Sequence, residues 1–144
     1  MPSKNMPRPP PFHPNRFPKR RAPMPIHNIL VVDDSPTDRQ YLTDILAKSG
    51  YNVSIAESAE EALVKVKQLK PDLVLMDVVM PGQNGFQATR ELSKNNATKH
   101  IPVIICTTKG QETDKYWGMR QGARDYIVKP ISRVDLLAKI SALG

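Results

Sequence analysis

The chain has 144 residues, of which 40% are hydrophobic, so its length and apolar content suit one globular domain with its own core. It carries 21 lysines and arginines against 14 acidic residues, and its net charge is +7. Six of these bases and no acid lie in residues 1–26, so the remainder is close to neutral. No apolar run approaches the roughly 18 residues of a membrane span, and we expect no transmembrane segment.

Residues 1–26 form a basic, proline-rich segment that we predict to be disordered or locally polyproline II. Nine of the 14 prolines lie here, and proline fixes φ and removes a backbone donor. Three interpretations stand: a flexible appendage, an electrostatic tether in which Phe12 and Phe17 are interleaved with bases, or an artefact of start-site choice with Met24 as the true start.

From residue 27 onward, short apolar runs alternate with segments of helical period, which is typical of a parallel sheet joined by crossover helices. We predict strands at 29–32, 53–55, 73–76, 103–106 and 126–128, each followed by a helix. The run 53–55 alternates apolar and polar residues and is placed at one edge, with 126–128 at the other. The sequence therefore predicts an α/β fold, a doubly wound (βα)5 sheet, for residues 27–144.

Residues that commonly cap or end helices lie at the predicted helix boundaries. Ser35-Pro36 fits the cap and first residue of the first helix, 58–61 is a capping box, Ser132 begins the last helix, and Gly50 ends the first. The apolar positions expected to pack on the sheet are Tyr41, Leu42, Ile45 and Leu46, then Ala59, Ala62, Leu63, Val66 and Leu69. The single cysteine, Cys106, lies in an apolar run, which predicts a buried reduced thiol and a cytoplasmic protein.

Polar residues follow the predicted strands, and the carboxyl ends of parallel strands meet at one edge. They are Asp33-Asp34, Asp77, Thr107-Thr108 and Lys129. Three carboxylates held together would repel one another unless a cation joined them, and oxygen ligands completed by water suit Mg²⁺. A metal-bound carboxylate can attack phosphorus while an ammonium neutralises developing charge. Asp77 fits this nucleophile and Lys129 this ammonium.

The chain resembles the receiver domains of response regulators, such as the chemotaxis protein CheY. The motifs are Val32-Asp33-Asp34-Ser35, Met76 to Gly82, Thr107, and Lys129-Pro130. Each motif is weak alone, but together, in this order at strand ends, they are highly specific. The resemblance covers residues 27–143 and implies a flavodoxin/CheY-like strand order of 2-1-3-4-5 and a lysine-proline bond that is commonly cis.

The resemblance also implies a role for each matching residue. Asp33 and Asp34 match the acidic pair that binds Mg²⁺, Asp77 the phosphorylated residue and metal ligand, Val79 the ligand that binds through its backbone carbonyl, Thr107 the switch hydroxyl, Lys129 the phosphate-contacting lysine, and Tyr126 the aromatic switch. The Tyr126 ring is expected to turn inward as Thr107 moves toward the phosphate. That movement would change the face formed by the fourth helix, fifth strand and fifth helix.

Three longer segments, 80–90, 107–114 and 121–126, resemble the PilG/PilH-type regulators of twitching motility. This implies a histidine kinase of a chemotaxis-like system as phosphodonor and an effect on type IV pili. No residues follow the last predicted helix, so we expect no DNA-binding output domain. A downstream protein would instead bind the switched face.

Several assignments have alternatives. Thr108 could act in place of Thr107, and Tyr126 could be a plain core aromatic. Tyr116 and Trp117 fall on the predicted fourth helix, where they either seal the core or anchor a partner.

The rival functions are a binding module, an aspartyl phosphatase and a nucleotide-binding enzyme. In the first, the basic tail contacts nucleic acid or an anionic surface. Aspartyl phosphatases are typified by a second acid two residues after the nucleophile, and this chain has Val79 there. A nucleotide-binding enzyme is disfavoured because no phosphate-binding glycine motif follows a predicted strand. We expect no turnover of a free substrate, only self-phosphorylation and dephosphorylation. Because Val79 and Lys109 replace residues that often influence hydrolysis, the phosphoryl lifetime is not predicted.

Overall fold

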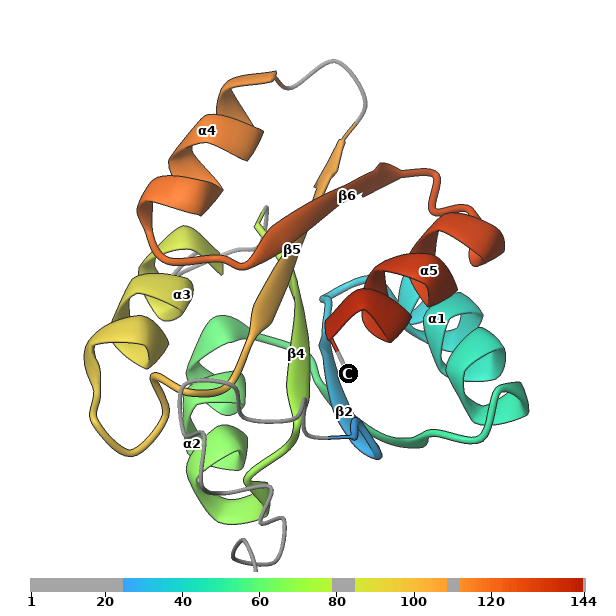
Figure 1. The fold of residues 1–144 in the computed structure, drawn as a ribbon, viewed down its shortest axis with the longest axis horizontal. Helices are drawn as coiled ribbons and strands as arrows, with labels where there is room; N and C mark the ends of the chain where they lie inside the picture. The colour runs from blue at the N-terminus through green and yellow to red at the C-terminus, as the bar shows by residue number, and fades with distance from the viewer. Residues whose placement is uncertain (1–24, 79–84, 109–111, 144) are drawn as a thin grey trace, which may run out of the picture.

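The computed structural model describes residues 25–78, 85–108 and 112–143 (Figure 1). The predicted N-terminal extension lies outside the described residues except for its last two positions, so the division between residues 26 and 27 stays a prediction. Of those two, Ile26 is partly buried and packs against the core.

Five strands alternate with five helices along the described residues. The strands are β2 (Asn28–Val32), β3 (Asn52–Ala56), β4 (Leu73–Asp77), β5 (Val103–Thr108) and β6 (Asp125–Lys129). The helices are α1 (Pro36–Lys48), α2 (Ala59–Leu69), α3 (Gly85–Lys94), α4 (Glu112–Arg120) and α5 (Arg133–Leu143). Each predicted strand is confirmed, with ends that differ by at most two residues.

The strands form one parallel sheet in the order β3-β2-β4-β5-β6. Counted along the chain this is 2-1-3-4-5, and the predicted fold class is confirmed. β3 and β6 are the edge strands, as predicted. For β3 the prediction came from its alternating pattern, whereas the run 126–128 is continuously apolar although it lies at an edge. All five strands run in the same direction, so their carboxyl ends lie along one edge.

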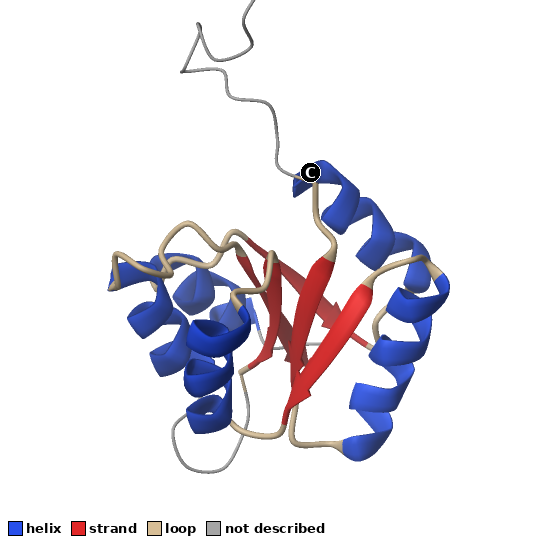
Figure 2. Cartoon of the chain, turned by 90° about the horizontal axis from the view of Figure 1, so that it is seen from below, coloured by secondary structure: helices blue, strands red, loops and turns tan. Residues whose placement is uncertain are grey.

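The helices cover the sheet on both faces, with α1 and α5 on one side and α2, α3 and α4 on the other (Figures 1 and 2). Successive side chains of a strand point to opposite faces. Leu30 and Val32 therefore belong to the core under α2 and α3, while Ile29 and Val31 belong to the core under α1 and α5. Two-sided burial explains why the central strands are continuously apolar.

The predicted helix caps are present. The Oγ of Ser35 accepts a hydrogen bond from the N–H of Asp38 at 3.2 Å, and the Oγ of Ser58 accepts one from the N–H of Glu61 at 3.1 Å. Ser132 caps α5 in the same way. These bonds satisfy backbone donors that the first turn of a helix leaves without partners, so the caps fix where the helices begin.

Two predicted core positions are wrong. Tyr41 is 47% exposed and Leu69 is 50% exposed. Tyr41 lies at the margin of α1, where its hydroxyl donates to the carbonyl of Ile131 at 2.7 Å. Leu69 is the last residue of α2, directly before Lys70, whose φ of 49° turns the chain away.

None of the described helices is long and apolar enough to cross a membrane.

Candidate functional site

Three aspartates gather at the carboxyl end of the sheet. Asp33 and Asp34 directly follow β2, and Asp77 is the last residue of β4. These strands are neighbours, and Val32 pairs with Met76, so their ends meet. One carboxylate oxygen from each aspartate lies within 4.8 Å of the other two. The structure thus brings together the three acids that the sequence analysis selected.

The oxygen-rich cluster is half buried. Asp33 is 1% exposed and Asp77 is 6% exposed, whereas Asp34 is exposed. Oδ1 of Asp33 accepts a hydrogen bond from the N–H of Ser35 at 2.9 Å. Burying carboxylates is costly unless positive charge is near, and an all-oxygen donor set open to water fits a hard divalent cation. Val79, whose carbonyl the resemblance implies as a further ligand, lies outside the described residues.

Lys129 brings positive charge to this cluster from the end of β6. Its Nζ lies 2.9 Å from Oδ2 of Asp33, 3.0 Å from Oδ2 of Asp38 and 3.8 Å from Oδ1 of Asp77. Burial lowers the pKa of Lys129, but the hydrogen bonds to Asp33 and Asp38 and the attraction of Asp77 outweigh it and raise this pKa above its ordinary value. The side chain is therefore charged at neutral pH. The Lys129-Pro130 bond is cis, as the resemblance implied.

Thr107 holds a buried hydroxyl without a hydrogen-bond partner. It is 1% exposed, and within the described part of the chain its Oγ1 is the buried side-chain atom left unsatisfied. Leaving such a group unpaired costs about 1–3 kcal/mol. Cys106 pairs with Asp77 across the sheet, so this hydroxyl lies one residue beyond the partner of Asp77. The side chain of Thr108 is outside the described residues, and the choice of Thr107 over Thr108 stays a prediction.

Cys106 is a free, buried thiol, as predicted. Its burial raises the pKa of the thiol to about 12. The group is therefore neutral at physiological pH and packs as a small apolar side chain.

Tyr126 is half buried on the outer strand of the sheet. It packs against the core under α2 and α3. The Nζ of Lys115 on α4 lies 5.0 Å from the ring centroid, and the Nζ of Lys139 on α5 lies 5.4 Å from it. Such distances allow cation–π attraction. The ring thus lies between one lysine of α4 and one lysine of α5, in contact with the core but not enclosed by it.

Tyr116 and Trp117 do not seal the core, and a role for them as anchors for a partner stays a prediction. They are 57% and 49% exposed. Their rings meet edge to face at 5.8 Å, and the guanidinium of Arg120 lies over both. They form part of the exposed surface of α4.

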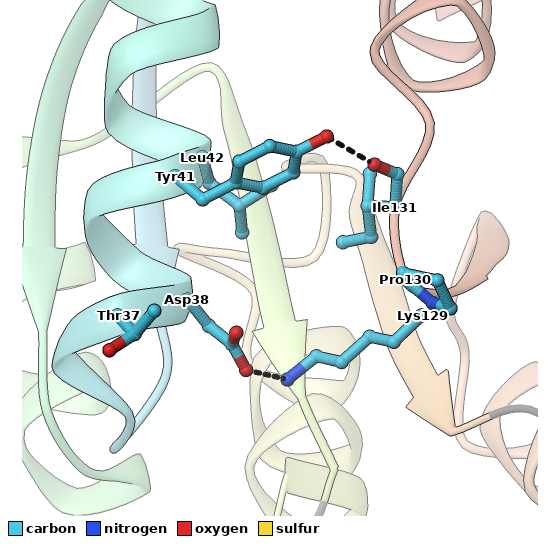
Figure 3. A pocket seen from close by; sticks show the side chains of 7 residues that line it. All are labelled: Thr37, Asp38, Tyr41, Leu42, Lys129, Pro130 and Ile131. Carbon is cyan, nitrogen blue, oxygen red and sulfur yellow. Dashed lines mark hydrogen bonds and ion pairs between the residues drawn. The ribbon is translucent and has the colours of Figure 1, made fainter.

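The structure adds Asp38 and Tyr41 to the site, and sequence reasoning assigned a site role to neither. Together with Lys129 and Ile131 they line a hollow of about 380 Å³ between α1 and the segment after β6 (Figure 3). The available sequence signal was the acid at the third position of a predicted helix. That signal indicates a favourable helix start and says nothing of a contact with Lys129.

Comparisons with known proteins agree with this geometry. Residues 29–141 match the family model described as the response regulator receiver domain. Protein PilH of Pseudomonas aeruginosa is 57% identical over 115 residues, which are 80% of this chain and 95% of PilH. The phosphate regulon transcriptional regulatory protein PhoB of the same organism is 38% identical over 115 residues, which are 80% of this chain but 50% of PhoB. The chain thus spans nearly all of PilH and about half of PhoB.

Solved structures show the same relation. Chemotaxis protein CheY4 of Vibrio cholerae matches with a TM-score of 0.77 and 30% identity, over 83% of this chain and 99% of that one. The receiver domain of NtrX from Brucella abortus matches with a TM-score of 0.75 and 28% identity, over 80% of this chain and 96% of that one. These matches confirm the resemblance drawn from the sequence motifs. The chain belongs to the family of response regulator receiver domains.

Proposed function

We propose that the chain is a single-domain response regulator that accepts a phosphoryl group on Asp77 and signals through a conformational switch. One observation carries the proposal. Asp77 shares an oxygen cluster within 4.8 Å with Asp33 and Asp34, and the Nζ of Lys129 is 3.8 Å from it. Phosphoryl transfer to a carboxylate requires a nucleophile surrounded by groups that neutralise charge, and this arrangement supplies them.

In the proposed step, a carboxylate oxygen of Asp77 attacks the phosphorus of a phosphohistidine. The new O–P bond forms as the N–P bond breaks, and the imidazole leaves with the electron pair. Hydrolysis follows when a water oxygen bonds to phosphorus, the Asp77 O–P bond breaks and inorganic phosphate departs. The chain would thus catalyse only its own phosphorylation and dephosphorylation.

We assign Mg²⁺ to the acidic cluster, with Asp33, Asp34, Asp77 and the backbone carbonyl of Val79 as its protein ligands. A bound Mg²⁺ neutralises charge on the phosphoryl oxygens and on the carboxylates. The all-oxygen donor set, with one exposed member, supports this assignment over softer metals. Lys129 supplies the second positive charge and donates to Oδ2 of Asp33, while the N–H of Ser35 donates to Oδ1.

We propose that Thr107 is the switch hydroxyl. A phosphoryl group on Asp77 carries about two negative charges where the free carboxylate carries one, and it brings three acceptor oxygens. The unpartnered Oγ1 of Thr107 gains most from such an acceptor, because the buried hydroxyl has none at present. Tyr126 would then turn inward, since it already contacts the core and is only half buried. The face formed by α4, β6 and α5 would change and recruit a downstream protein.

We further propose that the phosphodonor is a histidine kinase of a chemotaxis-like system, and that the output concerns twitching motility of type IV pili. The identity with PilH supports this placement. Output would be by contact rather than through a DNA-binding domain, in the cytoplasm, with residues 27–144 as the receiver domain and 1–26 as an extension.

The test is phosphoryl uptake measured by intact mass. The protein is incubated with Mg²⁺ and acetyl phosphate, beside an Asp77→Asn variant and an EDTA control. We expect one labile adduct of phosphoryl mass only in the wild-type protein incubated with Mg²⁺ and acetyl phosphate in the absence of EDTA. Folded protein that gains no adduct would refute phosphorelay. The binding module led by the basic tail would then be tested by salt-dependent binding before and after deletion of residues 1–23.

A further inference from the structure

The ammonium of Lys129 has two close carboxylate partners, and neither is the proposed acceptor. Its distances to Asp33 and Asp38 are 2.9 and 3.0 Å, and its distance to Asp77 is 3.8 Å. The first two are hydrogen bonds, while the third is a longer ion pair. Lys129 is therefore held nearer to α1 than to the group that it is proposed to assist.

Asp38 has no part in the chemistry described so far. It lies in the first turn of α1 rather than at a strand end, and it is not in the cluster of three aspartates. An acid in the first helical turn is favoured by the helix dipole without any partner. That role explains the residue type, but it does not explain why the carboxylate turns to Lys129, 91 residues away along the chain.

Hydrogen bonds hold both Asp38 and the segment that carries Lys129 in place. The N–H of Asp38 is held by the helix cap at Ser35. The hydroxyl of Tyr41, one turn further along α1, donates to the carbonyl of Ile131, two residues after Lys129, at 2.7 Å. Figure 3 shows the two bonds spanning the same hollow, one at each end. The Asp38–Lys129 pair is thus one of two hydrogen bonds that join α1 to the end of β6 and the residues after it.

We propose that Asp38 is a positioning residue that holds Lys129 on the α1 side before phosphorylation and competes with the phosphoryl group for its ammonium. The inference rests on the proposed function, because it takes Asp77 as the acceptor. A phosphoryl group on Asp77 recruits Lys129 only as the bond to Asp38 breaks. Asp38 therefore slows phosphoryl uptake and weakens the phosphorylated state relative to a chain without this carboxylate.

The variant that tests the proposal is Asp38→Asn, which keeps the shape of the side chain and removes its charge. Asp38→Glu restores a carboxylate and serves as the conservative rescue. Asp44→Asn is the matched control, because Asp44 is an exposed acid on the same helix that accepts a hydrogen bond from Gln40 at 2.8 Å. The change removes the same charge at a residue that does not contact Lys129, and the asparagine oxygen can still accept from Gln40.

Two measurements are made on the full chain. The first is the rate of phosphoryl uptake from acetyl phosphate by intact mass, at saturating Mg²⁺ and several donor concentrations. The second is the NMR resonance of the Lys129 side chain in protein with labelled lysine, without donor and without Mg²⁺. The second measurement reports the ion pair even in protein that takes up no phosphoryl group.

We expect Asp38→Asn to gain the phosphoryl group about 3- to 10-fold faster, the range for losing one half-exposed charged hydrogen bond. Asp38→Glu should return toward the wild-type rate, and Asp44→Asn should match it. The Lys129 resonance should shift in Asp38→Asn and not in Asp44→Asn. Equal or slower uptake in Asp38→Asn would overturn the competition. No uptake by the wild-type chain would refute the proposed function, and an unmoved Lys129 resonance would separately refute the positioning role.

Discussion

Gly85, the first residue of α3, lies against the end of β4, where a side chain has no room. A Cβ at this position would meet the carbonyl oxygen of Asp77 and come within 2.8 Å of the Cα of Val78. Both contacts are with main-chain atoms of the segment that carries the proposed acceptor. Gly85→Ala must therefore displace α3 from β4 or move the strand end itself.

The expected cost follows from these contacts. Inserting a methyl group into a packed site costs about 1–3 kcal/mol, and a rigid main-chain neighbour places this case in the upper half of that range. Alanine recovers at most about 1 kcal/mol through its higher helix propensity, and less at the first residue of a helix. We expect Gly85→Ala to lower the free energy of unfolding by about 1–2 kcal/mol. Phosphoryl uptake should fall as well, because Asp77 moves with the strand end.

Gly118 in α4 provides the matched control. A Cβ there would meet Cδ1 of Ile105, the far end of a flexible side chain, with Cγ1 at 3.0 Å. Ile105→Val removes Cδ1, so Gly118→Ala combined with Ile105→Val should lose less stability than the two single changes added together. No truncation of a neighbouring side chain can rescue Gly85→Ala in this way.

Urea unfolding followed by circular dichroism measures both effects, and intact mass measures uptake. A change in the free energy of unfolding below about 0.5 kcal/mol for Gly85→Ala, the size of an ordinary surface substitution, would refute the steric argument. Normal uptake together with lost stability would show that α3 moves and Asp77 does not.

Thr107→Val should stabilise the unphosphorylated protein by about 1 kcal/mol in urea unfolding, because it removes an unsatisfied buried hydroxyl, and a loss of stability would contradict that assignment. Thr98→Val, at a buried hydroxyl that donates to the carbonyl of Leu92 at 2.7 Å, should instead cost about 1 kcal/mol. Cys106 should resist a thiol reagent at pH 8 until the protein unfolds, and rapid labelling of the folded chain would contradict its burial. Because burial raises the pKa of Cys106 from 9.0 to about 12, the unfolded thiol ionises first, and the free energy of unfolding should fall as pH rises between these values. A Cys106→Ala variant should lack that part of the decline.

The order of elements and the identity of the acids were predictable because local rules decide them. Continuous apolar runs mark strands covered on both faces, and parallel strands bring Asp33 and Asp77 to one edge. The alternating pattern of β3 predicted its position at an edge. Each of these features depends on residues close together in sequence or on a general property of parallel sheets.

The side-chain contacts across the site were not predictable in the same way. Tyr41 fits a helical apolar face, yet its hydroxyl finds the carbonyl of Ile131 and the ring stays at the margin. Asp38 fits a helix start, and its bond to Lys129 depends on how α1 lies beside the end of β6. Such contacts join residues about 90 positions apart, and no periodicity or spacing in the sequence encodes them.

The position of β6 places the proposed phosphate-contacting lysine and the proposed aromatic switch on one strand. Tyr126 packs with the core on the α2 and α3 side, and Ile127 packs with the core on the α1 and α5 side. By the two-residue period of a strand, Lys129 shares the side of Ile127, where Asp38 lies. β6 has a single neighbouring strand, so fewer ladder hydrogen bonds oppose its movement than would oppose a central strand. If Lys129 changes partner as proposed, the change would act on an edge strand that carries Tyr126 on its other face.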